Sequence, residues 1–152
     1  MSNENAARPA TEPILLSAAL ASFEALWSPR IVTRVNDYDV RVAKVRGEHV
    51  WHVHEDTDEF FLVLDGTLEI ALRDGDGNGD GDGDGKGGDG ERSVTLEQGA
   101  VFVVPRGVWH LPRSGRGASI LLFEPSGTST VGDAHDAVPG HVDVTTGHAL
   151  DA

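Results

Sequence analysis

Apolar and polar residues alternate along several short segments of this chain. Leu68, Ile70 and Leu72 occupy every second position between 67 and 73, which is the period of a half-buried antiparallel strand. The same reading predicts strands at 31–36, 38–46, 49–54, 59–64, 67–73, 92–96, 101–104 and 118–123. Because these strands far outnumber the helical segments, the pattern predicts an all-β fold.

An apolar stripe with the period of a helix precedes the strands. It consists of Leu16, Leu20, Phe23 and Trp27, at i, i+4, i+7 and i+11. We expect an N-terminal helix over residues 14–28, ending before Pro29 and packing on an open edge or end of the β-domain. Residues 1–13 are polar and contain proline, so a disordered N-terminus is expected there.

Length and composition set the number of domains. A chain of 152 residues, 39% of them hydrophobic, can bury one core and is too short for two comfortable domains. We therefore expect one barrel over residues 31–124 and a C-terminal tail over 125–152. The lack of cysteine excludes disulfide bonds and thiolate metal ligands, and it agrees with a reducing compartment.

Charge and the N-terminal residues restrict the partners. The formal net charge of -13 argues against nucleic acid, whose phosphates repel an acidic surface. The N-terminus lacks the basic region of an export signal, and the apolar run at 14–21 is too short to span a membrane. We expect a soluble cytoplasmic protein that binds a small-molecule ligand or substrate and has no membrane partner.

A segment rich in glycine and aspartate, residues 74–91, interrupts the strands. It carries six Asp, one Glu, one Lys and no apolar residue, which predicts a flexible hairpin insertion. Five of its residues have the spacing of an EF-hand calcium loop, at positions 1, 3, 5, 6 and 12, and Asp89 lies next to position 9. The five are Asp80, Asp82, Asp84, Gly85 and Glu91. A Gly-Asp repeat produces this spacing in almost any register, and strands flank it, so weak non-specific attraction of cations is favoured over a specific calcium site.

Two histidines at alternate positions of one predicted strand are the clearest chemical signal. Residues i and i+2 of a strand point to the same face, so His52 and His54 present their imidazoles side by side. Glu59 enters from the next strand, and His110 follows a Pro-Arg-Gly turn far downstream. Three imidazoles and one carboxylate suit one divalent transition metal (Fe, Mn, Ni, Co, Cu or Zn) better than calcium or magnesium. Four protein ligands also leave positions open for water, substrate or dioxygen.

The segments around these residues resemble the two motifs of the cupin superfamily, G-x5-H-x-H-x3-4-E-x6-G and G-x5-P-x-G-x2-H-x3-N. Four residues rather than five separate Gly47 from His52, and Ser114 stands where the second motif has Asn. The resemblance covers residues 31–124 and implies a cupin-type antiparallel β-barrel or jelly roll. It also implies four metal ligands: His52, His54, Glu59 and His110. More narrowly, the chain is similar to single-domain bacterial cupins described as similar to mannose-6-phosphate isomerase, a label of similarity rather than activity.

The pocket beside this site is expected to be largely apolar. Alternate residues of a strand face the same side, so Phe61 and Val63 should point toward the metal like Glu59, and Phe60 and Leu62 should point away from it. Tyr38, Arg41 and Arg106 are further candidates for the substrate pocket, because they flank predicted barrel strands. The remaining histidines lack such partners and are interpreted as ordinary polar residues: His49, His135, His141 and His148.

A metal site of this kind favours a metal-dependent enzyme, of oxygenase or isomerase type, acting on a small organic molecule. The alternative is a non-catalytic module that binds or senses a small molecule. The sequence identifies no catalytic acid or base. Because exposed edge strands favour pairing, we also expect a homodimer joined through the barrel or its N-terminal helix.

Overall fold

A computed structural model describes residues 12–73 and 90–150 of the chain. The first element is a short helix, α2 (Leu16–Ala21). Ten strands follow in these ranges: β1 (Arg30–Val35), β2 (Tyr38–Glu48), β3 (His52–Val53), β4 (Glu59–Gly66), β5 (Leu68–Arg73), β6 (Glu91–Leu96), β7 (Val101–Val104), β8 (Trp109–Pro125), β9 (Ala134–His135) and β10 (His148–Ala149). The predicted all-β fold is confirmed.

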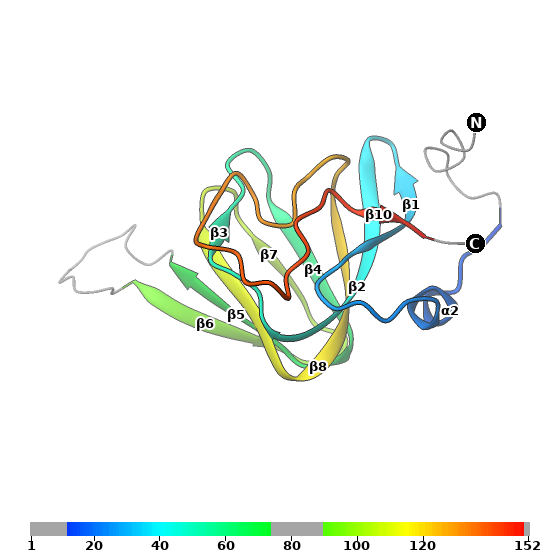
Figure 1. Ribbon diagram of the computed structural model, residues 1–152, viewed down its shortest axis with the longest axis horizontal. Coiled ribbons are helices and arrows are strands. Elements are labelled where there is room, and N and C mark those ends of the chain that lie inside the picture. The colour runs from blue at the N-terminus through cyan, green and yellow to red at the C-terminus, as the bar shows by residue number, and fades with distance from the viewer. Residues whose placement is uncertain (1–11, 74–89, 151–152) are drawn as a thin grey trace.

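One long strand, β8, connects two parts of the sheet. It pairs first with β5 and then with β4, while β2 runs antiparallel to most of its length. The sheet curls around an apolar interior (Figure 1), and its hydrogen-bonded ladder does not close into a ring within 12–73 and 90–150. The sequence predicts only the second half of β8, because Pro112, Gly115 and Gly117 interrupt the apolar pattern in the first half.

Side chains of β4 alternate between the interior and the outer face. Phe61 and Val63 are 2% and 0% exposed, whereas Phe60 and Leu62 are half-buried on the other side of the strand. The alternation therefore has the parity that the sequence predicts. It places Phe61 on the same face as Glu59, at the beginning of the strand.

The N-terminal helix is shorter than the predicted range 14–28. It ends at Ala21, and the backbone beyond it is irregular, with Trp27 at a φ of +53°. Phe23 packs with Ala19 against the outer side of the sheet, and Trp27 enters the main core. The backbone N–H of Trp27 donates to the carbonyl of Lys44, which ties this segment to β2 as an extended chain. The apolar stripe thus identifies buried residues correctly but predicts the wrong backbone for Phe23 and Trp27.

The C-terminal tail lies across the strands that carry the site (Figure 1). Val131 and Val142 are 3% and 6% exposed and complete the core. The tail is held by backbone hydrogen bonds, among them one from the N–H of Asp133 to the carbonyl of Val53 at 2.8 Å. β9 pairs with β3, and β10 pairs in parallel with β1. The tail is therefore part of the folded domain and covers one side of the interior.

Two predictions fall largely outside the described residues. The disordered N-terminus is predicted for residues 1–13, of which 1–11 lie outside the described residues. The insertion with its calcium-loop spacing is predicted for 74–91, of which 74–89 lie outside them. Within the described ranges, no helix is long and apolar enough to cross a membrane.

Candidate metal centre

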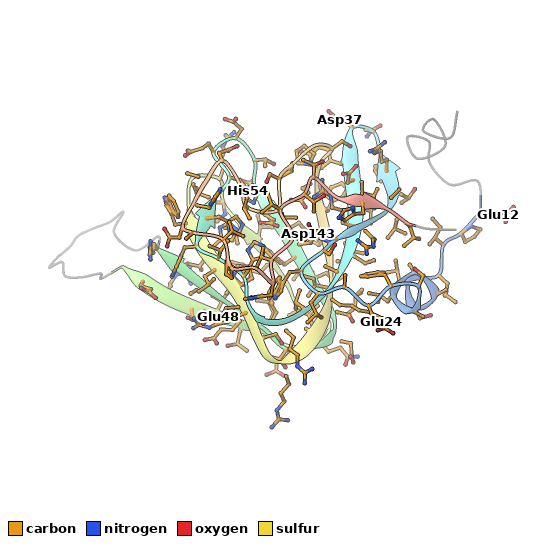
Figure 2. All side chains as sticks on the ribbon, viewed as in Figure 1. Glu12, Glu24, Asp37, Glu48, His54 and Asp143 are labelled. Atoms are coloured by element: carbon orange, nitrogen blue, oxygen red, sulfur yellow. The ribbon has the colours of Figure 1, made fainter. Side chains whose placement is uncertain are left out.

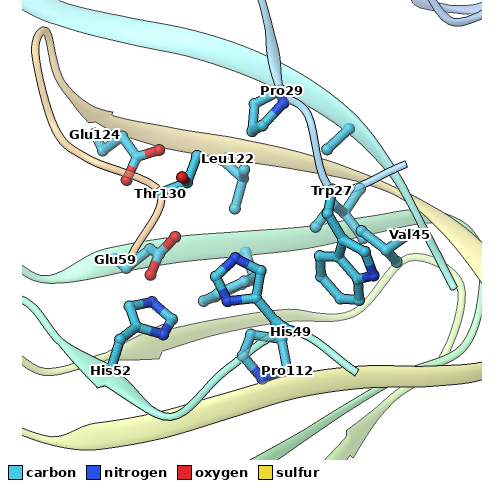
Figure 3. Close-up of a pocket in the computed structure, with 13 residues that line it drawn as sticks. Trp27, Pro29, Val45, His49, His52, Glu59, Pro112, Leu122, Glu124 and Thr130 are labelled. Carbon is cyan, nitrogen blue, oxygen red and sulfur yellow. The ribbon is translucent and has the colours of Figure 1, made fainter. Parts of the chain in front are cut away.

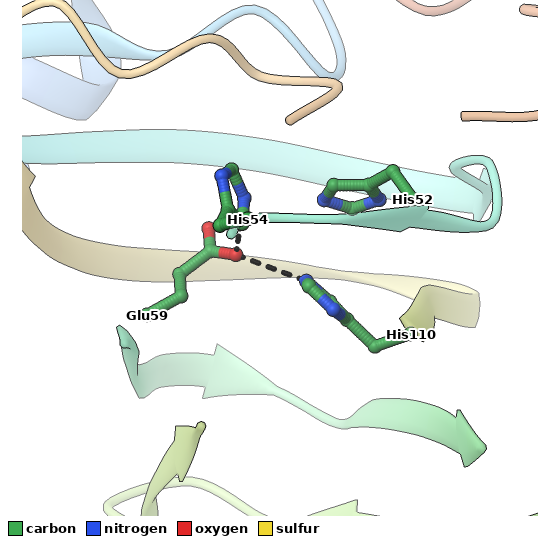
Figure 4. A group of neighbouring side chains, drawn as sticks. All are labelled: His52, His54, Glu59 and His110. Carbon is green, nitrogen blue, oxygen red and sulfur yellow. Dashed lines mark hydrogen bonds and ion pairs between the residues drawn. The ribbon is translucent and has the colours of Figure 1, made fainter. Parts of the chain in front are cut away.

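The four predicted metal ligands converge in the interior of the curled sheet (Figure 4). β3 and β8 pair at His52 and His110, which brings these two rings together with centroids 4.2 Å apart. His54 follows β3 directly, and Glu59 begins β4. One ligand atom from each of the four residues lies within 4.8 Å of the others, and all four side chains are buried. Figure 2 shows His54 inside the strands, with Glu24 and Glu48 at the outer surface.

Backbone carbonyls fix the orientation of two of the rings. Nδ1 of His52 donates to the carbonyl of Val50 at 2.8 Å, and Nδ1 of His110 donates to the carbonyl of Val108 at 2.9 Å. A carbonyl oxygen only accepts, so Nδ1 carries the proton in both rings. In the neutral tautomer Nε2 then presents a lone pair to the centre, which is the arrangement of a metal-binding histidine.

The contacts of Glu59 test whether these four residues fit a cation. Its Oε1 lies 3.1 Å from Nε2 of His110 and 3.1 Å from Nε2 of His54. Because Nδ1 of His110 already donates to a carbonyl, its Nε2 can complete the contact with Glu59 only through a second ring proton or a bound cation. Nε2 of His54 is buried and has no well-oriented hydrogen-bond partner among the described residues, despite its distance to Glu59. A positive ion or a proton must stand between these atoms, and the donor set fits a transition metal.

The protonation states follow from the same geometry. Burial, together with His110, holds the pKa of His52 well below its usual range. Burial opposes charge on His54 as well, but Glu59 outweighs it and raises the pKa of His54. Burial alone would raise the pKa of Glu59, and the two histidines outweigh it, so this pKa lies well below its usual range. Glu59 is thus an ionised carboxylate whose Oε1 lies against His54 and His110.

A cavity opens beside His52 and Glu59 (Figure 3). Its volume is about 40 Å³, which admits only a small molecule or one end of a larger one. Most of its wall is apolar and includes Trp27, Phe61 and Leu122. Three further polar residues line it: His49, Glu124 and Thr130.

Sequence reasoning missed His49 and Glu124. His49 is 7% exposed, and burial lowers its pKa to about 4, so the ring is neutral. Glu124 is 3% exposed, and burial together with the nearby Glu59 raises its pKa to about 8. Glu124 continues the inward positions of Ile120 and Leu122 in β8, and this parity is a signal that the sequence offers. For His49 we find no comparable signal, because it precedes the short strand β3.

The structure brings two of the five predicted pocket residues to the site. Phe61 lines the cavity. Arg41 is fully buried behind it, where its Nη1 lies 3.1 Å from Oε2 of Glu124. Arg41 therefore contacts the site through Glu124.

The other three predicted pocket residues lie elsewhere. Val63 is a core residue and does not line the cavity. Tyr38 points to the outer face of β2, because it is the neighbour of the inward-facing Asp39 and adjacent residues of a strand face opposite sides. Its ring stacks on that of Phe123. Arg106 is exposed in the turn after β7. A position beside a predicted barrel strand is thus a weak criterion for identifying a pocket residue, since neighbouring residues of a strand face opposite sides.

Comparison of the sequence with known proteins gives a family match and a curated relative. The family described as "Cupin domain" (Cupin_2) matches residues 39–122, more than half of the chain. A curated relative, "Uncharacterized protein YdbB" of Bacillus subtilis (strain 168), is 32% identical over 83 residues, which cover 55% of this chain and 59% of that relative. The matched part is therefore less than two thirds of the relative's own length.

Two solved structures are also similar. A cupin-2 domain containing protein from Shewanella frigidimarina NCIMB 400 is 38% identical with a TM-score of 0.61, covering 74% of this chain and 93% of that one. Protein NMB1881 from Neisseria meningitidis is 30% identical with a TM-score of 0.60, covering 76% of this chain and all of that one.

Proposed function

Since this chain belongs to the cupin family, we propose that it is a metal-dependent enzyme, of oxygenase or isomerase type, acting on a small organic molecule. The observation that carries the proposal is the cluster of three imidazole nitrogens and one carboxylate oxygen in a buried centre beside a cavity. His52, His54, Glu59 and His110 would hold one divalent transition ion, either Fe, Mn, Ni, Co, Cu or Zn. Such an ion supplies Lewis-acid chemistry, and a redox-active one also supplies oxygen-activating chemistry.

The residues around the centre have separate tasks in this proposal. The carbonyls of Val50 and Val108 hold two rings in the metal-binding tautomer. The apolar wall that includes Trp27 and Phe61 excludes water from the cavity, which strengthens every polar interaction inside it.

Glu124 supports catalysis over binding alone. With a pKa of about 8, its carboxyl is mostly protonated at neutral pH and ionises within the physiological range. A group of this kind in a cavity can hold a proton and exchange it with a substrate, which is the behaviour of a general acid or base. We assign Glu124 this role, while a non-catalytic binding module would not require it.

Metal content tests the first part of the proposal. After reconstitution with each first-row metal in turn, elemental analysis of the wild type should find about one ion per chain. The His52→Ala/His54→Ala double variant should hold far less. A matched double variant at two exposed histidines, His135→Ala/His141→Ala, should load like the wild type. Equally low metal in the wild type and the His52→Ala/His54→Ala variant would contradict the metal site.

Turnover tests the second part. Metal-loaded protein is offered sets of small alcohols, phenols and carbonyl compounds, with an oxygen electrode to detect an oxygenase and NMR to detect an isomerase. Glu124→Gln should keep its metal and lose turnover by about 10² or more, in line with removal of a general acid or base. A ligand whose NMR signals broaden on binding without forming product would favour the binding module instead.

We also propose a homodimer located in the cytoplasm. Support for the dimer comes from β7, whose Val101 and Val103 are 57% and 45% exposed on one side of the strand. Within the described ranges β7 pairs with β4 alone, so its other edge is open. The location is supported by the absence of cysteine, which agrees with a reducing compartment.

A further inference from the structure

His49 has a buried polar atom that the fold leaves without a partner. The side chain is more than nine-tenths buried, and its Nδ1 has no hydrogen-bond partner among the described residues. Figure 3 shows its ring inside the cavity, between Trp27 on one side and His52 on the other. Buried polar atoms in folded proteins are almost always paired, because leaving one unpaired costs about 1–3 kcal/mol. The unpaired nitrogen therefore indicates a function that is not structural.

The position of His49 places it within reach of a short ligand at the metal centre. Its ring centroid lies 4.9 Å from that of His52 and 5.1 Å from that of Trp27. A ligand of about three carbons, bound to the metal by one end, would bring its other end beside His49. The surrounding wall of Trp27, Phe61 and Leu122 suits the apolar middle of such a molecule.

The charges around the cavity exclude an anionic group at that far end. None of the residues that line the cavity, all within the described ranges, is Lys or Arg, whereas Glu59 and Glu124 both line it. Arg41 lies behind Glu124 and is fully engaged. Its Nε and Nη2 donate to Asp39, and its Nη1 donates to the carbonyl of Thr128 and lies against Glu124. A phosphate or carboxylate beside His49 would lose its hydration without gaining a cationic partner.

We infer that His49 is a specificity-determining residue of the proposed metal site, where it hydrogen-bonds an uncharged hydroxyl or carbonyl at the far end of a small, otherwise apolar ligand. This inference rests on the proposed function, because the near end of the ligand is held by the metal. It disfavours sugar phosphates as substrates. It also explains why a neutral imidazole, which can donate or accept a hydrogen bond, lines the cavity in place of a cation.

Three thiols that differ only at the far end test this inference on the cobalt-loaded protein: 3-mercapto-1-propanol, 1-propanethiol and 3-mercaptopropionate. The shared thiolate binds cobalt, and its charge-transfer absorption reports binding. In the wild type, the hydroxyl probe should bind more tightly than the methyl probe by about fivefold, the effect of one buried hydrogen bond, and more tightly than the carboxylate probe. In His49→Phe the preference for hydroxyl over methyl should disappear.

Two further variants control for packing. His49→Gln can still donate and accept a hydrogen bond, so it should retain most of the hydroxyl preference. His135→Phe, at an exposed position, should behave like the wild type. Comparison of variant and probe as a double-mutant cycle isolates the contact of His49 with the hydroxyl group.

The outcomes separate this inference from the proposed function. A wild type that does not load cobalt refutes the metal site and the inference together. Loaded protein that binds none of the thiols, or binds the carboxylate probe most tightly, overturns the inference alone. An unchanged hydroxyl preference in His49→Phe also overturns it.

Discussion

Nη1 of Arg41 lies 3.1 Å from Oε2 of Glu124, and both side chains are almost completely buried beside the cavity. Arg41 also donates from Nε and Nη2 to Asp39, which in turn accepts hydrogen bonds from Arg34 and Ser126. Burial would raise the pKa of Asp39, but these hydrogen bonds lower it. A fully buried guanidinium thus connects a structural carboxylate with the carboxyl that faces the candidate metal centre.

Removal of the Arg41 charge should destabilise the domain strongly. Arg41→Met removes two hydrogen bonds that the buried Asp39 carboxylate accepts, although Arg34 remains as a partner, and it also removes the contact with Glu124. Breaking a buried ion pair such as Arg41–Asp39 by removing one partner typically costs about 3–5 kcal/mol. A matched change at a more exposed pair, Arg113→Met, which removes the contact with Glu69, should cost about 1 kcal/mol or less. Urea unfolding followed by circular dichroism measures both. Similar losses for the two variants would contradict the central role of Arg41.

The raised pKa of Glu124 predicts a pH dependence of stability. The folded state holds this proton up to about pH 8, whereas the unfolded chain releases it near 4.5. The folded state therefore binds more protons in this window, so the stability contribution is fully present below about pH 4.5 and is lost as the pH rises through about 8. The slope is at most about 1.4 kcal/mol per pH unit.

Glu124→Gln should flatten this part of the profile. Thermal melts of metal-free wild type and variant between pH 5 and 9 provide the comparison, with EDTA present so that metal binding does not contribute. We expect the variant to gain stability relative to the wild type as the pH increases. A constant difference across the range would show that the pKa of Glu124 is not raised in the folded protein.

The contrast between Phe61 and Glu124 shows how much the sequence can predict. Alternation in β4 correctly assigns Phe61 to the interior, because the parity of a strand is a local property. Local patterns also indicate the four ligand residues, since His52 and His54 share the predicted strand 49–54, while Glu59 and His110 complete the two sequence motifs. Glu124 and Arg41 are a pair only because β2 and β8 lie side by side, and their partnership depends on contacts between distant parts of the chain.

The N-terminal segment illustrates a second limit. An apolar residue at every third or fourth position indicates a helix. The helix nevertheless ends at Ala21, and the buried side chains of Phe23 and Trp27 come from a segment with irregular backbone. The hydrogen bond of the Trp27 N–H to Lys44 and that of its indole Nε1 to Arg46 fix the chain along β2 instead. Tertiary contacts thus override a periodic pattern that contains only four apolar positions.

Metal binding should raise the melting temperature. A ligand at 100 times its Kd adds about 2.7 kcal/mol to the stability of a protein that binds it only when folded. For a chain of this size that corresponds to about 5–10 °C. Differential scanning fluorimetry with and without metal should show this increase in the wild type and in the His135→Ala/His141→Ala control. The His52→Ala/His54→Ala variant should show none, and an equal increase in that variant would place the stabilising metal elsewhere.

The open edge of β7 predicts the position of the dimer contact. Lysine at an exposed edge strand opposes pairing, so the Val101→Lys/Val103→Lys variant should shift the protein toward the monomer. Val144, in the C-terminal tail, is 58% exposed, and Val144→Lys serves as the matched control. Light scattering at micromolar concentration measures the mass of each. A monomeric wild type would refute the dimer, and a variant that remains dimeric would place the contact elsewhere, for example at the N-terminal helix.

Gly132 holds the tail against β3, the strand that carries His52 and is followed directly by His54. Its φ is +69°, and a Cβ at this position would overlap the carbonyl of Val53. Gly132→Ala therefore combines backbone strain with a clash against β3, and we expect a loss of about 2–3 kcal/mol together with weaker metal binding. Gly127 has a similar φ of +90°, but no atom lies within 4 Å of the place that a Cβ would take. Gly127→Ala is therefore a control that introduces backbone strain without steric overlap, and it should cost about 1 kcal/mol. Chemical denaturation and metal titration measure both effects. If the two variants lose equal stability and bind metal equally well, the tail does not support the metal centre.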